Sequence, residues 1–255
     1  MVRQYERFGL LGYTYAKSAY NVMYDMTIDP SDFNGTVKMT TDAAGTEIRY
    51  TLDGSAPSAS SLLYHKPFVI DNSAVINAGS FYGSLLESTI TSIEYHRHLA
   101  TGQKPSLASK YNNGFPGSGD YTLTNCLRGS KDYGDGQWQG FLGNDLEAVI
   151  DLGVQQSIVK LSSTYFHNTG VWIFMPKRVM YEVSVDGINY RLLADMVNET
   201  PQTTEGPYIK DFTYTGDSVA ARFVRMTAKN IGVCPEWHVG AGAGAFMFCD
   251  EIVVE

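Results

Sequence analysis

Short runs of alternating hydrophobic and polar residues follow one another along the chain from about Met26. Such alternation is typical of strands that bury one face, because successive side chains of a strand point to opposite sides. The first group consists of TVKMTT, EIRYTLDGSAPSASSLLY, KPFVI, AVINAGSFYG and STITSIEYH. The second consists of LEAVIDLG, SIVKLSSTYF, VMYEVSVDGINYRLL, ARFVRMTAKN and FCDEIVVE. The pattern predicts an all-β protein.

The segment HLATGQKPSLASKYNNGFPGSGDY separates the two groups. It is rich in Gly, Pro, Ser and Asn, which is typical of long loops and domain boundaries. A junction near Leu99 gives two β-sandwiches in tandem, a small one over residues 26–98 and a larger one over residues 99–255. Residues 1–25 largely lack the alternation, and we interpret them as a short helix or tail with too little apolar face to be stable alone.

Two Asp-Gly pairs stand between alternating runs, Asp53-Gly54 and Asp186-Gly187. The central positions of tight hairpin turns favour positive φ, which glycine adopts without a steric cost. Asp53-Gly54 therefore predicts a two-residue hairpin or a tight turn, and Asp186-Gly187 predicts a second hairpin turn.

The formal net charge is −8, and no cluster of Lys and Arg stands out. Nucleic acid and anionic membranes lack the electrostatic attraction that would hold them, so neither is expected as a partner. No apolar run approaches the roughly twenty residues that a membrane-spanning helix needs. Neutral ligands such as sugars stay open.

Three cysteines, Cys126, Cys234 and Cys249, allow at most one internal disulfide, and their pairing is open. Cys234, His238 and Cys249 do not match a common zinc pattern, since a structural site needs a fourth ligand at similarly close range. Cys249 stands in the apolar run FMFC, which predicts a buried thiol. A Cys-His nucleophilic pair has no third group that the sequence identifies.

Gly240, Gly242 and Gly244 alternate with alanine, but the run has neither the spacing of a dinucleotide-binding loop nor the Gly-Lys-Ser/Thr of a P-loop. We interpret it as a tightly turning loop. The nearby Asp250-Glu251 pair does not suit acid–base catalysis, because adjacent residues of a strand point to opposite faces. One of the two is expected to face solvent.

Two separate segments, FHNTGVWIF and AKNIGVCPEWH, each combine tryptophan, histidine and asparagine. Sugars bind to this combination, because their C–H faces pack on aromatic rings while imidazole and amide groups hydrogen-bond to their hydroxyls. The competing interpretation is that both tryptophans belong to the core. The candidate carbohydrate-binding residues are His167, Asn168, Trp172, Asn230, Trp237 and His238.

Three longer segments of the second half resemble a discoidin (coagulation factor 5/8 type C) module. They are LTNCLRGSKDYGDGQWQGFLGNDLEAVIDLG, WIFMPKRVMYEVSVDGINY and ARFVRMTAKNIGVCPEWHVGAGAGAFMFCDEIVV. More narrowly, they are similar to the family 32 carbohydrate-binding modules of bacterial glycoside hydrolases. The resemblance covers about residues 100–255 and implies a discoidin-like jelly roll of the galactose-binding type, with sugar-binding loops at one end.

Upstream, IRYTLDGSAPSASSLLYHKPFVI resembles the small immunoglobulin- or fibronectin-III-like sandwich that follows the catalytic barrel of chitobiases and β-N-acetylhexosaminidases. The signature is YTLDGS-x-P followed by S-x-LY and a proline, and the resemblance covers roughly residues 26–98. The tail YERFGLLGYTYAKSAYNV is similar to the end of a family 20 glycoside hydrolase barrel. That makes residues 1–25 a remnant of the catalytic domain plus a linker.

In this order the pieces resemble the C-terminal accessory region of a bacterial β-hexosaminidase. The family's catalytic Asp-Glu pair lies in an H-x-G-G-D-E context that this chain lacks, so we expect no enzymatic activity from the chain alone. We predict a monomeric, non-catalytic region whose discoidin-like module binds glycans that contain N-acetylhexosamine or galactose. The alternative is a structural brace that packs against the catalytic domain without glycan affinity. The resemblance also implies a periplasmic, cell-surface or secreted location.

Discoidin modules often hold a structural calcium, through an Asp-Gly loop near the first strand, a Glu near the C-terminus and backbone carbonyls. The matching positions here are Asn125-Cys126 and Glu251. Asn and Cys stand where relatives tend to have Asp and Gly, which removes a carboxylate from a site that gains affinity from each one. The resemblance thus implies a candidate calcium site at Asn125 and Glu251 but no required cofactor.

Overall fold

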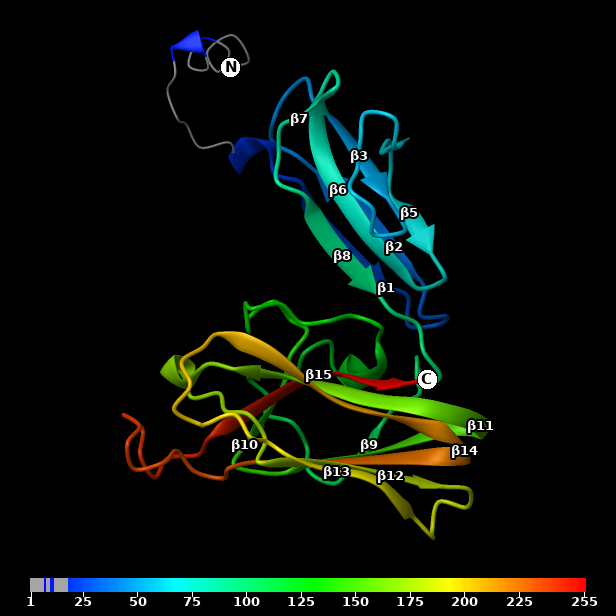
Figure 1. Ribbon diagram of the computed structural model, residues 1–255, viewed down its shortest axis with the longest axis vertical. Helices are drawn as coiled ribbons and strands as arrows, with labels where there is room; N and C mark the ends of the chain where they lie inside the picture. The colour runs from blue at the N-terminus through cyan, green and yellow to red at the C-terminus, as the bar shows by residue number, and fades with distance from the viewer. Residues whose placement is uncertain (1–6, 8–9, 12–17) are drawn as a thin grey trace. The chain divides into compact units, whose positions relative to one another are not determined.

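The computed structural model describes residues 7, 10–11 and 18–255 and divides the chain into two compact units. Unit 1 is Met1–His96 and unit 2 is Arg97–Glu255. Strands make up both units (Figure 1), which confirms the prediction of an all-β protein. The interpretation of residues 1–25 as a helix or tail concerns mostly residues that the structure does not describe. Among the described residues, no helix is long and apolar enough to cross a membrane.

Unit 1 begins with the 3-10 helix η1 (Ser18–Tyr20) and contains two antiparallel sheets. In the three-stranded sheet, β2 (Gly35–Thr40) lies between β1 (Met23–Ile28) and β5 (Phe68–Ile70). The five-stranded sheet has the order β4-β3-β6-β7, and β8 also pairs with β6. Its strands are β3 (Glu47–Thr51), β4 (Leu62–Leu63), β6 (Ala74–Tyr82), β7 (Leu85–Leu86) and β8 (Thr91–Tyr95).

Alternate residues of these strands form the core of unit 1. On β2, Val37 and Met39 are buried, whereas Lys38 between them is exposed. Ile76 and Ile93 of the other sheet are buried as well. Each such side chain contributes about 1.5–3 kcal/mol through removal of apolar surface from water. The alternation in the sequence is therefore the pattern of the folded sandwich.

The Asp53-Gly54 pair does not form the predicted tight hairpin turn. It lies in the loop 52–61, between β3 and β4. Gly54 does have a positive φ of 78°, but its N–H donates to the carbonyl of Val75 on β6 (2.8 Å). The Asp53 carboxylate accepts from the Ser55 N–H (3.0 Å). The prediction is wrong because β6 holds the glycine, and the chain returns to β3 only at Leu62.

Unit 2 contains one seven-stranded sheet of order β10-β15-β11-β14-β12-β13, and β9 pairs with β11. Two 3-10 helices, η2 (Thr122–Thr124) and η3 (Thr169–Val171), lie in its loops. The strands are β9 (Ser106–Leu107), β10 (Gln139–Leu142), β11 (Leu146–His167), β12 (Arg178–Ser184), β13 (Arg191–Val197), β14 (Tyr208–Lys229) and β15 (Phe246–Val254).

The long strands β11 and β14 fold this sheet into two layers (Figure 1). Residues 146–151 of β11 pair with 223–228 of β14, and residues 156–167 pair with 208–221, with register shifts between them. Strands β9, β12 and β13 extend the first part, and β15 and β10 extend the second. Because bulges bend strands, the two parts form the layers of a sandwich around a shared core.

A second, aromatic core lies beside the main core of unit 2. Trp138 is 2% exposed and packs with the Phe166 ring, with centroids 5.5 Å apart. Its indole Nε1 donates to the carbonyl of Ser130 (2.9 Å). A Cβ added at Gly129 would lie 2.2 Å from the indole ring, so the chain passes the tryptophan where only glycine fits.

Candidate functional site

The loop after β11 and the loop before β15 meet at one end of unit 2, away from the bend of β11 and β14 (Figure 1). His238 joins them. Its Nδ1 accepts from the Gly240 N–H (3.0 Å), so Nε2 carries the proton and donates to the carbonyl of Thr169 (2.8 Å). The side chain is 7% exposed. His238 therefore holds the two loops together from within, with little surface open to a ligand.

Trp172 and Trp237 lie around this histidine with much of their surface open. Trp172 is 37% exposed and Trp237 50% exposed. Both rings meet His238 edge to face, with centroids 5.9 and 5.7 Å away. The buried Phe174 ring lies 5.3 Å from His238 and supports it. Two indoles from distant parts of the sequence thus form one partly exposed surface, which we call the tryptophan surface.

The glycine-alanine run lets the loops approach closely. A Cβ at Gly240 would lie 2.7 Å from the Trp172 ring, so the second loop runs directly against the first tryptophan. Gly242 has a positive φ of 81°, and its N–H donates to the carbonyl of Cys234 (3.0 Å). The interpretation of this run as a tightly turning loop agrees with these contacts.

Trp172 is presented by local backbone geometry. It follows η3 in the left-handed region, with a φ of 67°, which is rare for a bulky side chain. Asn168 prepares this turn, since its Oδ1 accepts from the Gly170 N–H (3.1 Å) and its backbone N–H donates to the carbonyl of Ile173 (2.9 Å). The Asn168 side chain is half-buried, and its Nδ2 has no hydrogen bond within the described part of the chain. It remains a candidate donor to a ligand.

His167 and Asn230 do not belong to this surface, and their assignment as sugar-contacting residues is wrong. His167 is fully buried: its Nδ1 accepts from the Met175 N–H (3.2 Å) and its Nε2 donates to the carbonyl of Thr204 (2.9 Å). Asn230 is 4% exposed, and its amide bonds to backbone groups of neighbouring segments. Both residues hold loops in place from beneath.

The buried His167 makes the stability of unit 2 depend on pH. Burial lowers the pKa of His167 from its ordinary value of 6.5, and protonated Nδ1 would face the Met175 N–H. At this position the unfolded chain therefore binds more protons below about pH 6.5, so the contribution of His167 to the free energy of unfolding should fall as the pH drops, by at most ~1.4 kcal/mol per unit. Urea unfolding at pH 7.5, 6.5 and 5.5 measures this (the range brackets the ordinary pKa of histidine).

His167→Gln should flatten this dependence relative to the unchanged chain. His65→Gln, which replaces an exposed histidine of unit 1, is the matched control for the loss of a histidine. If His167→Gln and the unchanged chain changed in stability equally on acidification, the neutral buried imidazole would not contribute to the pH dependence.

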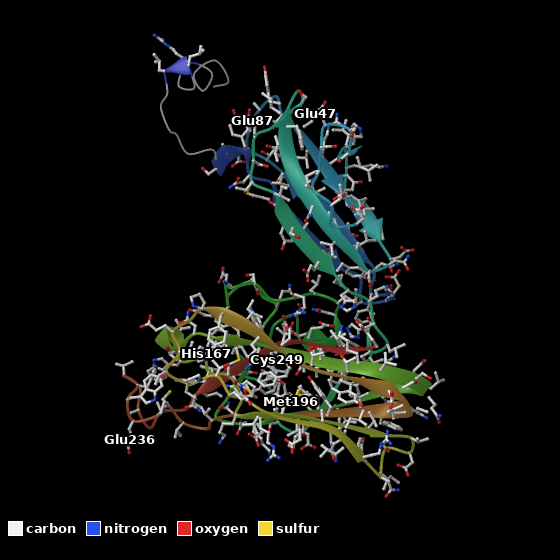
Figure 2. The ribbon with its side chains drawn as sticks, viewed as in Figure 1. Glu47, Glu87, His167, Met196, Glu236 and Cys249 are labelled. Carbon is white, nitrogen blue, oxygen red and sulfur yellow. The ribbon has the colours of Figure 1, made fainter. Side chains whose placement is uncertain are left out.

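Phe174 was not among the sequence candidates, although it supports the site. The alternating run WIF places Trp172 and Phe174 two positions apart, which is the signal that could have paired them. Figure 2 shows Glu236 on the loop that precedes β15, at the edge of unit 2, whereas His167 and Cys249 lie within the body of this unit. Glu236 is exposed and adds a carboxylate at the rim of the tryptophan surface.

All three cysteines are buried, and Cys234 and Cys249 are free thiols, which confirms the expected burial of Cys249. Burial raises the pKa of the Cys234 thiol, and raises that of Cys249 well above its usual range. A nucleophilic thiol needs the opposite shift. Among the described residues, no group of three or more His, Cys, Asp or Glu side chains could hold a metal ion.

Asp250 and Glu251 lie on β15, and both are buried, so the expectation that one faces solvent is wrong. Asp250 Oδ2 accepts from the Gly129 N–H (2.8 Å) and from Arg128 Nε (3.3 Å). Burial raises the pKa of Asp250 to about 7 and that of Glu251 well above its usual range. Neither carboxyl group can reach a glycosidic bond from the core of a sheet.

Asn125 and Glu251 are neighbours, as the calcium hypothesis requires, but their oxygens serve protein donors. Asn125 Oδ1 accepts from the Leu127 N–H (2.9 Å), and Glu251 Oε1 accepts from the Cys126 N–H (3.1 Å). His98 Nε2 lies 2.8 Å from the same Oε1. Glu251 Oε2, which has no hydrogen bond within the described residues, is one oxygen where calcium takes six to eight. These side chains do not fit a calcium ion.

Residues 31–92, within unit 1, match the family model of the chitobiase/beta-hexosaminidase C-terminal domain. The match confirms the resemblance identified in the sequence for this unit. No curated protein sequence matches the chain.

Several solved structures are similar to the chain. The C-terminal domain of a chitobiase from Bacteroides fragilis has 16% identity and a TM-score of 0.36, and covers 60% of this chain and 93% of that one. The module CpGH89CBM32-5 from Clostridium perfringens, in complex with GalNAc-β-1,3-galactose, has 17% identity and a TM-score of 0.39, covering 60% and 94%. Chitosan-binding module 1 from Paenibacillus sp. IK-5 has 18% identity and a TM-score of 0.38, and the match covers 63% of this chain and 99% of that one. Likeness of this degree carries no inference about ligands.

Proposed function

We propose that the chain is a non-catalytic accessory region of a glycan-degrading enzyme, and that unit 2 binds glycans at the tryptophan surface. The observation that carries the proposal is the convergence of Trp172 and Trp237 on His238, with both indoles partly exposed. Indole faces of this kind pack against the C–H faces of sugar rings, and Asn168 supplies a free amide donor nearby. The ligand class that this proposal names is a glycan with terminal N-acetylhexosamine or galactose.

The family match of unit 1 supports the enzymatic context. We extend it to a parent β-N-acetylhexosaminidase, with its catalytic domain as the partner and a monomeric state. A periplasmic, cell-surface or secreted location belongs to the same proposal. Incubation of the chain with a chromogenic N-acetylglucosaminide should give no product, because its buried carboxylates cannot act on substrate.

The alternative, a structural brace without glycan affinity, is favoured by tryptophans that are buried within unit 2. Their exposures of 37% and 50% favour binding instead. A brace that packed another surface of unit 2 against the catalytic domain would leave two large apolar rings in water.

We expect a glycan-array screen of the chain to give binding to N-acetylhexosamine- or galactose-terminated glycans, with dissociation constants near millimolar because a single sugar buries little area. In calorimetry, Trp237→Ala should weaken binding about tenfold and Trp172→Ala by a similar factor, as expected for loss of one aromatic contact of roughly 1–1.5 kcal/mol.

Val239→Ser is the matched control, since Val239 is exposed in the same loop and adjacent to His238 but carries no aromatic ring. It should bind as the unchanged chain does. Folded protein that shows no binding at millimolar glycan would contradict the proposal and favour the brace.

A further inference from the structure

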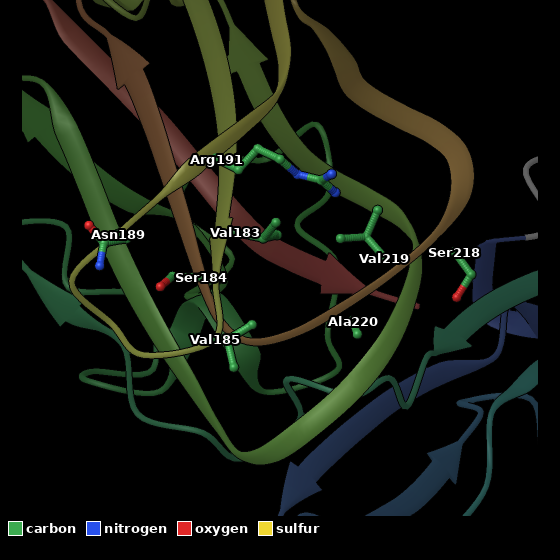
Figure 3. Close-up of a pocket in the computed structure, with 8 residues that line it drawn as sticks. All are labelled: Val183, Ser184, Val185, Asn189, Arg191, Ser218, Val219 and Ala220. Atoms are coloured by element: carbon green, nitrogen blue, oxygen red, sulfur yellow. The ribbon is translucent and has the colours of Figure 1, made fainter.

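A cavity of about 410 Å³ opens at the surface of unit 2, between the β12–β13 loop and the bend of β14 (Figure 3). Four of its eight lining residues are apolar, and the other four are polar or charged. Its lining residues are Val183, Ser184, Val185, Asn189, Arg191, Ser218, Val219 and Ala220.

Two irregular segments form the cavity. One is the loop between β12 and β13, where Gly187 has a φ of 75° and a Cβ would lie 3.2 Å from the Phe223 ring. The other is a bulge in β14. Val219 pairs with Ile158 and Thr215 with Lys160, so residues 216–218 stand opposite the single Val159. The bulge pushes Ser218 away from the regular ladder and opens space beneath the β12–β13 loop.

The Asp186 carboxylate, in the β12–β13 loop that lines the cavity, accepts all its hydrogen bonds from its own loop and the end of β12. Asp186 Oδ1 accepts from the N–H groups of Ile188 (2.9 Å) and Asn189 (2.8 Å) and from the Ser184 hydroxyl (2.8 Å). Asp186 Oδ2 accepts from Asn189 Nδ2 (2.8 Å). These donors hold the pKa of Asp186 well below its usual range. The carboxylate of Asp186 is therefore hydrogen-bonded within the β12–β13 loop.

Arg191 has no comparable partner. Arg222 pairs with Asp151 and Arg225 with Glu182, each at 2.7 Å, on the same side of unit 2. Within the described residues, the Arg191 guanidinium has no hydrogen bond or ion pair, and Figure 3 shows its side chain extended towards Val219. A planar five-donor group at the wall of a cavity is suited to a carboxylate, which it can bind through two parallel hydrogen bonds.

We propose that this cavity is a second binding site of the chain, for a sugar unit that carries a carboxylate, such as a uronic acid. Arg191 pairs with the carboxylate. The Ser218 hydroxyl and the Asn189 side-chain oxygen, which have no hydrogen bonds of their own within the described residues, meet sugar hydroxyls. Val185 and Val219 pack against the C–H face. The net charge of −8 repels anions in general, so selectivity for a carboxylate rests on this one guanidinium.

The full chain is titrated with D-glucuronate and D-galacturonate, and binding is followed by amide chemical shifts in NMR. D-glucose and D-galactose are the neutral matches, and inorganic sulfate tests for a general anion site. At the amides of the residues that line the cavity, we expect saturation by at least one uronate near 10 mM or below, roughly the weak end of measurable affinity, with the neutral sugars and sulfate at least about tenfold weaker at these amides.

Four variants decide the role of the cavity. Arg191→Gln should weaken uronate binding at least about tenfold, the effect of one charge-assisted contact. Ser218→Tyr, which fills the cavity but keeps the guanidinium, should do the same. Lys177→Gln removes one positive charge at the other end of unit 2, and Trp237→Ala removes the other surface; neither should change uronate binding.

Uronate binding that survives Arg191→Gln, absence of saturation in the unchanged chain, or equal binding of sulfate would each overturn this proposal. The outcome is separate from that of the tryptophan surface, because loss of neutral-glycan binding in Trp237→Ala says nothing about the cavity, and the reverse holds for Arg191→Gln.

Discussion

Replacement of Trp138 by alanine is expected to destabilise unit 2 by about 3–5 kcal/mol, the usual cost of removing a large buried aromatic side chain. The indole is 2% exposed and lies among Phe166, Phe248 and Ile173 in the aromatic core. Its Nε1 donor to the Ser130 carbonyl is lost as well. The space left by the missing indole would be bounded by strands β11 and β15. Each of these strands is paired on both sides, so neither can move into that space without breaking its hydrogen bonds to its neighbours.

Urea unfolding followed by tryptophan fluorescence measures this loss directly. All three tryptophans lie within unit 2, so the signal reports on that unit even though unit 1 shares the chain. Trp237→Ala is the matched control: the same change at a half-exposed position should cost less than about 1 kcal/mol. Similar losses in the two variants would show that Trp138 is not a core residue.

Gly129 gives a sharper version of the same test. A Cβ at this position would lie 2.2 Å from the indole, so Gly129→Ala should destabilise the unchanged chain substantially. In the Trp138→Ala background the ring is absent, and the same substitution should cost much less. A double-mutant cycle therefore predicts a coupling of about 1 kcal/mol or more between the two positions. Additive effects would contradict the contact.

Replacement of Asn230 by alanine is expected to destabilise unit 2 by about 2–3 kcal/mol and to weaken glycan binding at the tryptophan surface. Asn230 Nδ2 donates to the carbonyls of Phe141 (3.0 Å) and Ala245 (3.2 Å), and its Oδ1 accepts from the Gly232 N–H (2.9 Å). These bonds tie both ends of the 230–245 loop to β10. Without them the loop that carries Trp237 loses its fixed position, so binding weakens although Asn230 contacts no ligand.

Asn230→Asp distinguishes loss of these hydrogen bonds from loss of side-chain volume, because aspartate has nearly the same size as asparagine. The carboxylate keeps the acceptor for Gly232 but turns an oxygen towards two carbonyls, so Asn230→Asp should be at least as destabilising as Asn230→Ala. Asn72→Ala, at an exposed position of unit 1, should leave the fluorescence transition of unit 2 unchanged. A fully stable Asn230→Asp variant would contradict the hydrogen-bond pattern.

Much of the fold followed from the sequence because alternation is a local property. The buried and exposed positions of β2 read directly from TVKMTT, and Asp186-Gly187 does lie in the hairpin between β12 and β13, with Gly187 at positive φ. Its loop is longer than the two residues expected. Asp53-Gly54 failed because the partner of Gly54 is Val75 on a strand further along the chain, which composition does not reveal.

The candidate site was predicted less completely. The residue types at the tryptophan surface were visible in two segments, but their division into exposed rings and buried supports was not. That division depends on distant carbonyls, of Thr204 for His167 and of Ala245 for Asn230. The Arg191 cavity had no sequence signal, since it arises from a register shift between β11 and β14.

The position of β15 has a consequence for biosynthesis. This strand lies between β10 and β11, and its last residue, Val254, accepts a hydrogen bond from the Leu99 N–H (2.8 Å). Unit 2 therefore joins its first residues to its last, and its sheet cannot close until residues 246–254 have left the ribosome. The described strands of unit 1 pair with one another within residues 23–95, so this sandwich can fold during translation. During synthesis, unit 1 should therefore be folded while unit 2 is still incomplete. Until residues 246–254 emerge, the apolar strands of unit 2 stay exposed and accessible to chaperones.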